Sequence, residues 1–122
     1  MKNETFGLVT KIVKHIDDKL GQNITVLDLN GISTLCDYFV ITSTPSIRQV
    51  KAITDEIQDR LEEEGVYVLH KEGYTSGRWV LLDYGDIVIH ILYKEDREFY
   101  NIEGIWKDAA IINIDKIIEN NI

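Results

Sequence analysis

Three histidines, His15, His70 and His90, are the first side chains to consider for chemistry, because imidazole is a common metal ligand and general base. No two of them have the i, i+4 spacing that places two ligands on one face of a helix. His15 lies in a helical pattern, and His90 lies in a strongly apolar strand. A hydrogen-bonded structural role is therefore the preferred interpretation of each histidine, and no metal site is expected.

The remaining candidates for catalysis are one cysteine and one pair of carboxylates. Cys36 has no neighbouring base in the sequence, so we interpret it as a small buried hydrophobic residue rather than a nucleophile. Asp83 and Asp86 flank a tight turn, where aspartates hydrogen-bond the local backbone. The turn at 42–46 precedes a helix and could bind an anion, but it lacks glycine, and Pro45 lacks an N–H. We therefore predict no enzyme activity, no catalytic residue and no cofactor.

The elements that position these side chains follow from the apolar pattern. Gly21 is predicted to end the first helix in a left-handed cap, Thr44 to cap the second helix, and Pro45 to be its first residue. Gly85 supplies the positive φ of a hairpin at Asp83–Asp86. The predicted helices are 3–20, 45–64 and one or two short pieces within 94–106, and the predicted strands are 24–29, 38–42, 66–69, 78–82 and 87–92, with a loop at 71–77.

One mixed α/β sheet with flanking helices is the simplest architecture for this order. The strand 87–92 is apolar on both faces, so we place it at the centre of the sheet. One domain is expected over 1–110. Residues 111–122 are expected to form a C-terminal tail, either helical or dependent on a partner for its structure.

Length, charge and composition restrict the class of protein. The chain has 122 residues and 44% hydrophobic residues, which suits one globular domain. It has no apolar run near the ~20 residues that span a bilayer, no signal-peptide pattern at residues 1–5, and one cysteine, so a cytoplasmic protein is expected. A net charge of −8 argues against a dedicated nucleic-acid surface. The charge permits a basic protein partner, or it simply keeps the protein soluble.

Aromatic residues in the second half of the chain often stand beside charges, as is typical of interface centres. The alternative is that two or three of them fill the core, as we expect for Phe99. Trp79, Leu81 and Asp83 share one face of their strand. If that face is exposed, it forms an apolar patch with an acidic edge, but the sequence leaves open which face is exposed.

Several segments together resemble the ribosomal silencing factor family, also called Iojap. The most specific is Gly77–Asp86, with the sequence GRWVLLDYGD, which follows a matching Ser76. The others are Asp37–Ile41, Arg48–Ile53, Glu72–Gly73, and Arg97–Glu103 followed by Trp106 and Asp108–Ala109. The resemblance covers roughly residues 5–110. The chain departs from the family in having Thr44-Pro45 where a glycine-containing turn is usual, and Gln49 where histidine is usual.

The resemblance implies a fold related to the nucleotidyltransferase fold without its catalytic motif, and a non-enzymatic role. It implies binding to the large ribosomal subunit through ribosomal protein L-fourteen, a block of small-subunit joining, and repression of translation under nutrient limitation. It also implies a homodimer when free. The partner-binding residues that we predict are Glu72, Trp79, Leu81, Asp83, Tyr93, Tyr100 and Trp106.

Two other functions remain open at the level of sequence. The first is a nucleotidyltransferase-type enzyme, suggested by the fold relation and by Asp83 and Asp86. The second is a dimeric scaffold for a different basic partner.

Overall fold

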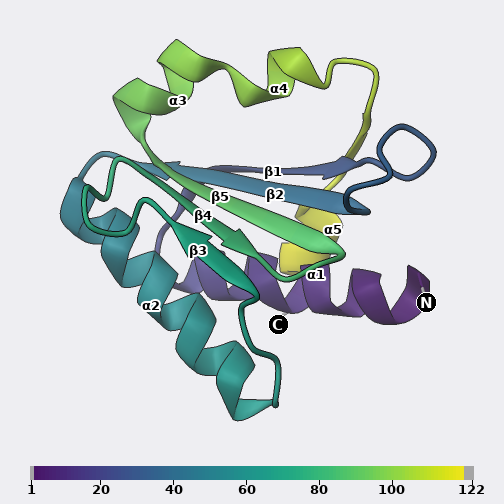
Figure 1. Cartoon of the computed structure of the whole chain (residues 1–122), viewed down its shortest axis with the longest axis horizontal. Coiled ribbons are helices and arrows are strands. Elements are labelled where there is room, and N and C mark those ends of the chain that lie inside the picture. Colours follow the sequence, from purple (N-terminus) through teal and green to yellow (C-terminus); the bar gives the residue numbers. More distant parts are fainter. Residues whose placement is uncertain (1, 120–122) are drawn as a thin grey trace.

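The computed structural model describes residues 2–119, which form a six-stranded mixed sheet in the order β3-β4-β5-β2-β1-β6 (Figure 1). Strands β2 and β5 are parallel, and every other adjacent pair is antiparallel. The predicted mixed α/β sheet with flanking helices is confirmed. The helices are α1 (Lys2–Asp18), α2 (Ile47–Glu63), α3 (Lys94–Tyr100), α4 (Ile102–Ile105) and α5 (Asp115–Glu119), and the strands are β1 (Gln22–Asp28), β2 (Tyr38–Thr44), β3 (His70–Glu72), β4 (Trp79–Asp83), β5 (Ile87–Tyr93) and β6 (Ala110–Ile112).

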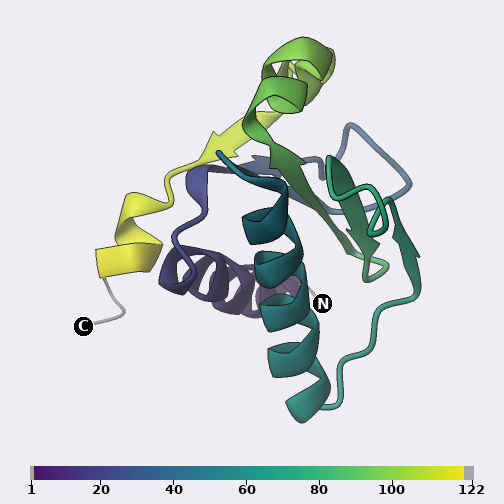
Figure 2. The same ribbon diagram turned by 90° about the vertical axis from the view of Figure 1, so that its left-hand side faces the viewer.

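The helices form two unequal layers, with α1 and α2 on one face of the sheet and α3 and α4 on the other (Figure 2). The apolar faces of α1 and α2 close a main core over residues such as Val40 and Ile89, which are fully buried. A smaller core under α4 includes Ile41, Leu92 and Ile102. Strands β2 and β5 contribute to both cores, so β5 is central as predicted. No helix within residues 2–119 is both long and apolar enough to cross a membrane.

The predicted start of the second helix was wrong by two residues. Ser46 is the N-cap, and its hydroxyl accepts a hydrogen bond from the backbone N–H of Gln49 at 3.1 Å. Thr44 is the last residue of β2, and its hydroxyl accepts from the backbone N–H of Ser46 at 3.2 Å. The Thr44 side chain is therefore used in a local turn over Pro45, before the helix begins at Ile47.

The left-handed residue after α1 is Leu20, with φ of 64°, and not Gly21 as predicted. Gly21 is required for a different reason, which is close packing. A Cβ atom at this position would lie 2.3 Å from Ile16 Cγ2 and 2.7 Å from Thr42 Oγ1. Because both neighbours are buried, neither has space to move away.

Gly21→Ala is therefore expected to lower the free energy of unfolding by about 1–3 kcal/mol. Gly7→Ala is the matched control, because Gly7 is exposed within α1 and has no atom within 4 Å of the added Cβ. Alanine is the better helix former, so Gly7→Ala is expected to raise stability by about 0.5–1 kcal/mol. Urea unfolding of both variants measures the difference, and equal effects of the two would contradict this account of Gly21.

The third strand was predicted at 66–69, but residues 66–69 are irregular and β3 is His70–Glu72, which overlaps the start of the loop predicted at 71–77. Val66 and Val68 are half-buried against the main core, which explains their apolar character without a strand. All three residues of β3 are exposed. An edge strand of this kind depends on backbone pairing, so side-chain hydrophobicity could not reveal it.

The chain after Ala109 continues the same sheet. Strand β6 pairs with β1, placing Ile112 opposite Val26. Helix α5 follows, and its Ile117 is buried in the main core. Residues 120–122 of the predicted tail lie outside the described residues.

Candidate functional site

The face of β4 that the sequence left undecided is settled by side-chain alternation. Val80 and Leu82 are fully buried in the main core beneath α1 and α2. Trp79, Leu81 and Asp83 therefore face the opposite side of the sheet, and all three are half-buried. We call this side, over β3, β4, β5 and β2, the open face, because α3 and α4 cover it incompletely.

Two hollows that share Leu81 form a groove on the open face. The first hollow has a volume of about 300 Å³, and the second hollow has a volume of about 330 Å³. The first is lined mainly by apolar side chains, and the second lies between Trp79 and β3. The linings are Ser33, Leu35, Cys36, Phe39, Leu81, Asp83, Val88, His90 and Trp106 for the first, and Glu72, Gly73, Trp79 and Leu81 for the second.

Aromatic rings from α3 and the end of α4 stand at the edges of the groove. The ring centroid of Tyr100 lies 4.9 Å from that of Trp79. Trp106 contacts Phe39 edge to face, with 5.8 Å between the ring centroids. These contacts hold large flat side chains in place while leaving part of their surface accessible, as at the centres of protein interfaces.

Phe99 was expected in the core, but its side chain is 80% exposed. The inward position of α3 is occupied by Arg97, which is buried. Residues two apart on a helix face different directions, so Phe99 is turned away from the sheet. Its exposed ring packs edge to face on Tyr100, with centroids 5.0 Å apart, and extends the apolar surface beyond the groove.

His90 lies in β5 opposite Leu81 and is 4% exposed. Its Nδ1 atom accepts a hydrogen bond from Trp79 Nε1–H at 3.1 Å, which fixes the orientation of the indole. Burial lowers the pKa of His90 from its ordinary value of 6.5 to about 4. The structural role predicted for this histidine is thus present, and it is a role within the groove.

The free energy of unfolding is expected to fall as the pH decreases from about 6.5 to about 4, because in this range His90 binds a proton in the unfolded chain but not in the folded chain. The stability that neutral His90 contributes is fully present above its unfolded pKa of 6.5 and is lost as the pH falls towards its folded pKa of about 4. Its full size is about 3 kcal/mol. Urea unfolding between pH 7 and pH 4 measures it. His90→Gln removes the titrating group and is expected to give a flatter pH dependence, whereas an unchanged slope would contradict the assignment.

Three carboxylates surround the Cys36 end of the groove. Burial, followed by the negative charges of Asp37, Asp83 and Asp86, raises the pKa of the Cys36 thiol to about 11. Such a thiol is a poor nucleophile at neutral pH, as expected for a buried structural cysteine. The Asp83 carboxylate accepts a hydrogen bond from the backbone N–H of Gly85 at 2.8 Å, which confirms its predicted role in the turn.

We call Asp37, Asp83 and Asp86 the acidic rim. Among the side chains that the structure describes, none pairs with any of these three carboxylates. The same part of the chain contains no group of three histidine, cysteine or acidic side chains arranged to hold a metal ion. The acidic rim therefore presents negative charge that is not neutralised within the described protein, which suits a basic group of a partner.

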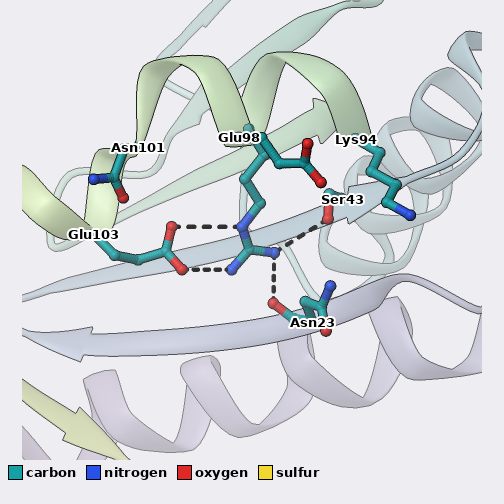
Figure 3. Close-up of a pocket in the computed structure, with 7 residues that line it drawn as sticks. Asn23, Ser43, Lys94, Glu98, Asn101 and Glu103 are labelled. Carbon is teal, nitrogen blue, oxygen red and sulfur yellow. Dashed lines mark hydrogen bonds and ion pairs between the residues drawn. The ribbon is translucent and has the colours of Figure 1, made fainter.

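A separate polar pocket of about 270 Å³ lies under α3 and is formed around the side chain of Arg97. The guanidinium group donates to the Asn23 carbonyl oxygen at 2.6 Å, to Ser43 Oγ at 3.2 Å and to Thr25 Oγ1 at 3.0 Å, and it pairs with Glu103 at 2.8 Å. Figure 3 shows Glu103 on one side of these bonds and Ser43 and Asn23 on the other. Because Arg97 already has partners, we interpret the pocket as the attachment of α3 and α4 to the sheet.

Comparison with known proteins identifies the family. Residues 2–121 match the family described as "Ribosomal silencing factor during starvation". The chain is 44% identical over 99 residues to ribosomal silencing factor RsfS of Bacillus subtilis, covering 81% of this chain and 84% of the relative. The chain belongs to the ribosomal silencing factor family. The match extends beyond the residues 5–110 over which the motifs are recognisable.

Solved structures agree with this membership. A crystal structure of a protein from Chromobacterium violaceum superposes with a TM-score of 0.80 at 34% identity, covering 83% of this chain and 84% of the other. A crystal structure of a Bacillus halodurans protein gives 0.77 at 35% identity, covering 91% and 98%. As a member of the silencing factor family, the protein has a role in ribosome silencing and associates with the ribosome, so it regulates translation.

The structure of this silencing factor places six of the seven predicted contact residues on the open face. Glu72, paired opposite Leu81, joins Trp79, Asp83, Tyr100 and Trp106 there. Tyr93 lies apart from them, because it packs against the main core on the face of the sheet that α1 and α2 cover. The guanidinium of Arg78 lies 5.4 Å from the centre of the Tyr93 ring.

Phe39, His90 and Leu35 belong to the silencing factor's groove, yet they were not among the predicted contacts. The hairpin sequence was sufficient to predict that His90 lies beside Leu81. The register that pairs Asp83 with Val88 necessarily places Leu81 opposite His90. Phe39 and Leu35 could not be placed in this way, since they come from a parallel neighbour strand and from the loop before it.

Proposed function

We propose that this silencing factor binds the large ribosomal subunit through ribosomal protein L-fourteen, using the groove and the acidic rim. The bound protein blocks joining of the small subunit and represses translation in the cytoplasm under nutrient limitation. The observation that carries the proposal is an apolar groove on the open face, bordered by carboxylates that no described side chain pairs with. A basic ribosomal protein with an apolar contact residue complements both features.

A subunit-joining experiment tests this function. Purified large subunits are incubated with the protein, small subunits are added, and the fraction of joined ribosomes is measured by sucrose-gradient sedimentation. The proposal predicts co-sedimentation of the protein with large subunits and fewer joined ribosomes as its concentration rises. Binding without any loss of joined ribosomes would overturn the steric block, and no binding would overturn the ribosomal partner.

Charge reversal at the acidic rim is expected to weaken this binding several-fold at low salt and less at high salt, because the interaction of exposed charges is screened. Asp86→Lys is suitable because its side chain is exposed. Asp59→Lys on the exposed surface of α2 is the matched control, with the same change in net charge. Affinities measured at two salt concentrations separate the effects, and equal losses for both variants would implicate overall charge instead of the rim.

We further propose that the free protein is a homodimer. Phe99 and Ile105 on α3 and α4 are 80% and 72% exposed, which is a large apolar surface for a monomer. Analytical ultracentrifugation of the wild type and of a Phe99→Ser, Ile105→Ser variant tests the proposal. A wild type that sediments as a monomer at micromolar concentration would contradict it.

A further inference from the structure

His90 is a buried polar residue with one hydrogen-bonding atom unused. Its Nδ1 atom accepts from Trp79, and its ring packs edge to face on Phe39 with 4.5 Å between centroids. Its Nε2 atom is buried and has no hydrogen-bond partner within residues 2–119. Buried polar atoms in folded proteins nearly always have a hydrogen-bond partner, and an atom left without one destabilises the structure.

The bond from Trp79 determines where the proton of His90 resides. A nitrogen that accepts a hydrogen bond carries no proton, so Nδ1 is unprotonated. Burial lowers the pKa of His90 to about 4, so the ring is neutral at pH 7. A neutral imidazole has one N–H, which must then be on Nε2. His90 therefore offers an unused hydrogen-bond donor, and its missing partner must be an acceptor.

This donor belongs to a residue that lines the first hollow of the groove, beside Leu81, Phe39 and Val88. The hollow has a volume of about 300 Å³, far more than the roughly 30 Å³ share of one water molecule. It is large enough for a side chain from another molecule. The acidic rim at its Cys36 end disfavours a second copy of this chain, whose net charge is −8, and favours a basic partner.

We infer that the basic ribosomal partner seats an apolar side chain in this hollow and places a carbonyl oxygen on the Nε2–H of His90. The inference rests on the proposed function and adds a specificity-determining residue to it. A partner with an apolar side chain but without the acceptor leaves the donor of His90 buried and unpaired. Such a mismatch discriminates between partners more strongly than loss of apolar contact alone.

Two substitutions separate the two nitrogens of His90. In His90→Gln, the side-chain N–H₂ reaches the position of Nε2, so a donor to the partner is kept and the acceptor for Trp79 is lost. In His90→Asn, the shorter side chain reaches only the position of Nδ1, so an acceptor for Trp79 is kept and the donor to the partner is lost. Thermal unfolding of each variant confirms that it is folded before binding to purified large subunits is measured.

The inference predicts that His90→Gln binds large subunits within about threefold of wild type, whereas His90→Asn binds at least about tenfold more weakly. The reverse order would overturn the inference and would show that His90 acts only by orienting Trp79. Equal binding of wild type and both variants would also overturn it, with the proposed function intact. Failure of the wild type to bind would overturn both. If the variants changed self-association but kept the wild-type affinity for large subunits, the inference would be overturned, because the hollow would then bind a second copy of this chain.

The wild-type protein provides a measurement that needs no variant. Long-range ¹H–¹⁵N correlation spectra of histidine-labelled protein assign the tautomer of His90 directly. The inference predicts a neutral ring at pH 7 with its proton on Nε2. A proton on Nδ1 would overturn it, because Nε2 would then be an acceptor and would require a donor from the partner.

Discussion

Trp79→Ala is expected to weaken binding to the large ribosomal subunit by about 30-fold or more, which corresponds to a loss of about 2 kcal/mol or more of binding free energy. The indole borders the second hollow of the groove and packs against the ring of Tyr100, with 4.9 Å between the ring centroids. Its Nε1–H is fixed by His90 at 3.1 Å, so little side-chain entropy is lost when a partner binds. A half-buried, preoriented tryptophan of this kind is typical of an interface hot spot.

Tyr67→Ala is the control for this experiment, because Tyr67 is a 64% exposed aromatic residue in the connection between α2 and β3. Its truncation is expected to leave binding unchanged. Titration of labelled protein with large subunits gives both affinities. Wild-type affinity of Trp79→Ala would remove the groove from the account of binding, and an equal loss in both variants would indicate a nonspecific aromatic effect.

Arg97→Ala is expected to lower the free energy of unfolding by about 3 kcal/mol. The side chain of Arg97 is 10% exposed and pairs with the one-third exposed Glu103. Without the guanidinium group, Glu103 loses its partner, and the carbonyl oxygen of Asn23 and the hydroxyl of Thr25 each lose a donor. Because Arg97 attaches α3 to β1, the variant also loosens Tyr100 against Trp79, so subunit binding is expected to weaken as well.

Arg60→Ala is the matched control. Arg60 also pairs with two carboxylates, Glu56 and Glu63, but its side chain is 50% exposed on α2. Exposed pairs are screened by water and add little to stability. Urea unfolding of both variants is therefore expected to show a large loss for Arg97→Ala and a minor one for Arg60→Ala. Similar midpoints for the two would contradict the interpretation of Arg97 as the attachment of α3 and α4.

Sequence periodicity predicted the elements of the main core well, because burial there imposes an apolar pattern. The helices over 3–20 and 45–64 were confirmed with small shifts at their ends, as were the strands near Tyr38 and Ile87. Capping was less predictable. Thr44 and Ser46 are both chemically suitable caps, and the choice depends on where β2 ends, which tertiary packing decides.

Strands β3 and β6 were not predictable in the same way. Each has three residues and lies at an edge of the sheet, where pairing depends on the backbone of a distant segment. Phe99 illustrates the same limitation for single residues. Hydrophobicity predicted burial, but the neighbouring Arg97 occupies the inward position of α3 because β1, β2 and α4 supply its partners.

Much of the candidate site could be predicted from residue types, but its geometry could not. Alternation along β4 grouped Trp79, Leu81 and Asp83 correctly, while the exposed face depended on which side α1 and α2 cover. Tyr93 was included for its aromatic character, yet as the last residue of β5 it faces the side of the sheet that α1 and α2 cover.

Side-chain oxidation footprinting tests the docking of the open face most directly. The protein is exposed to hydroxyl radicals alone and in complex with large ribosomal subunits, and oxidation is quantified at each residue by mass spectrometry. The account predicts protection of Trp79, Tyr100 and Leu35 in the complex, with Tyr67 and Leu20 unchanged. Protection of Tyr67 and Leu20 together with unchanged oxidation of Trp79 and Leu35 would contradict it, because the ribosome would then contact a different surface.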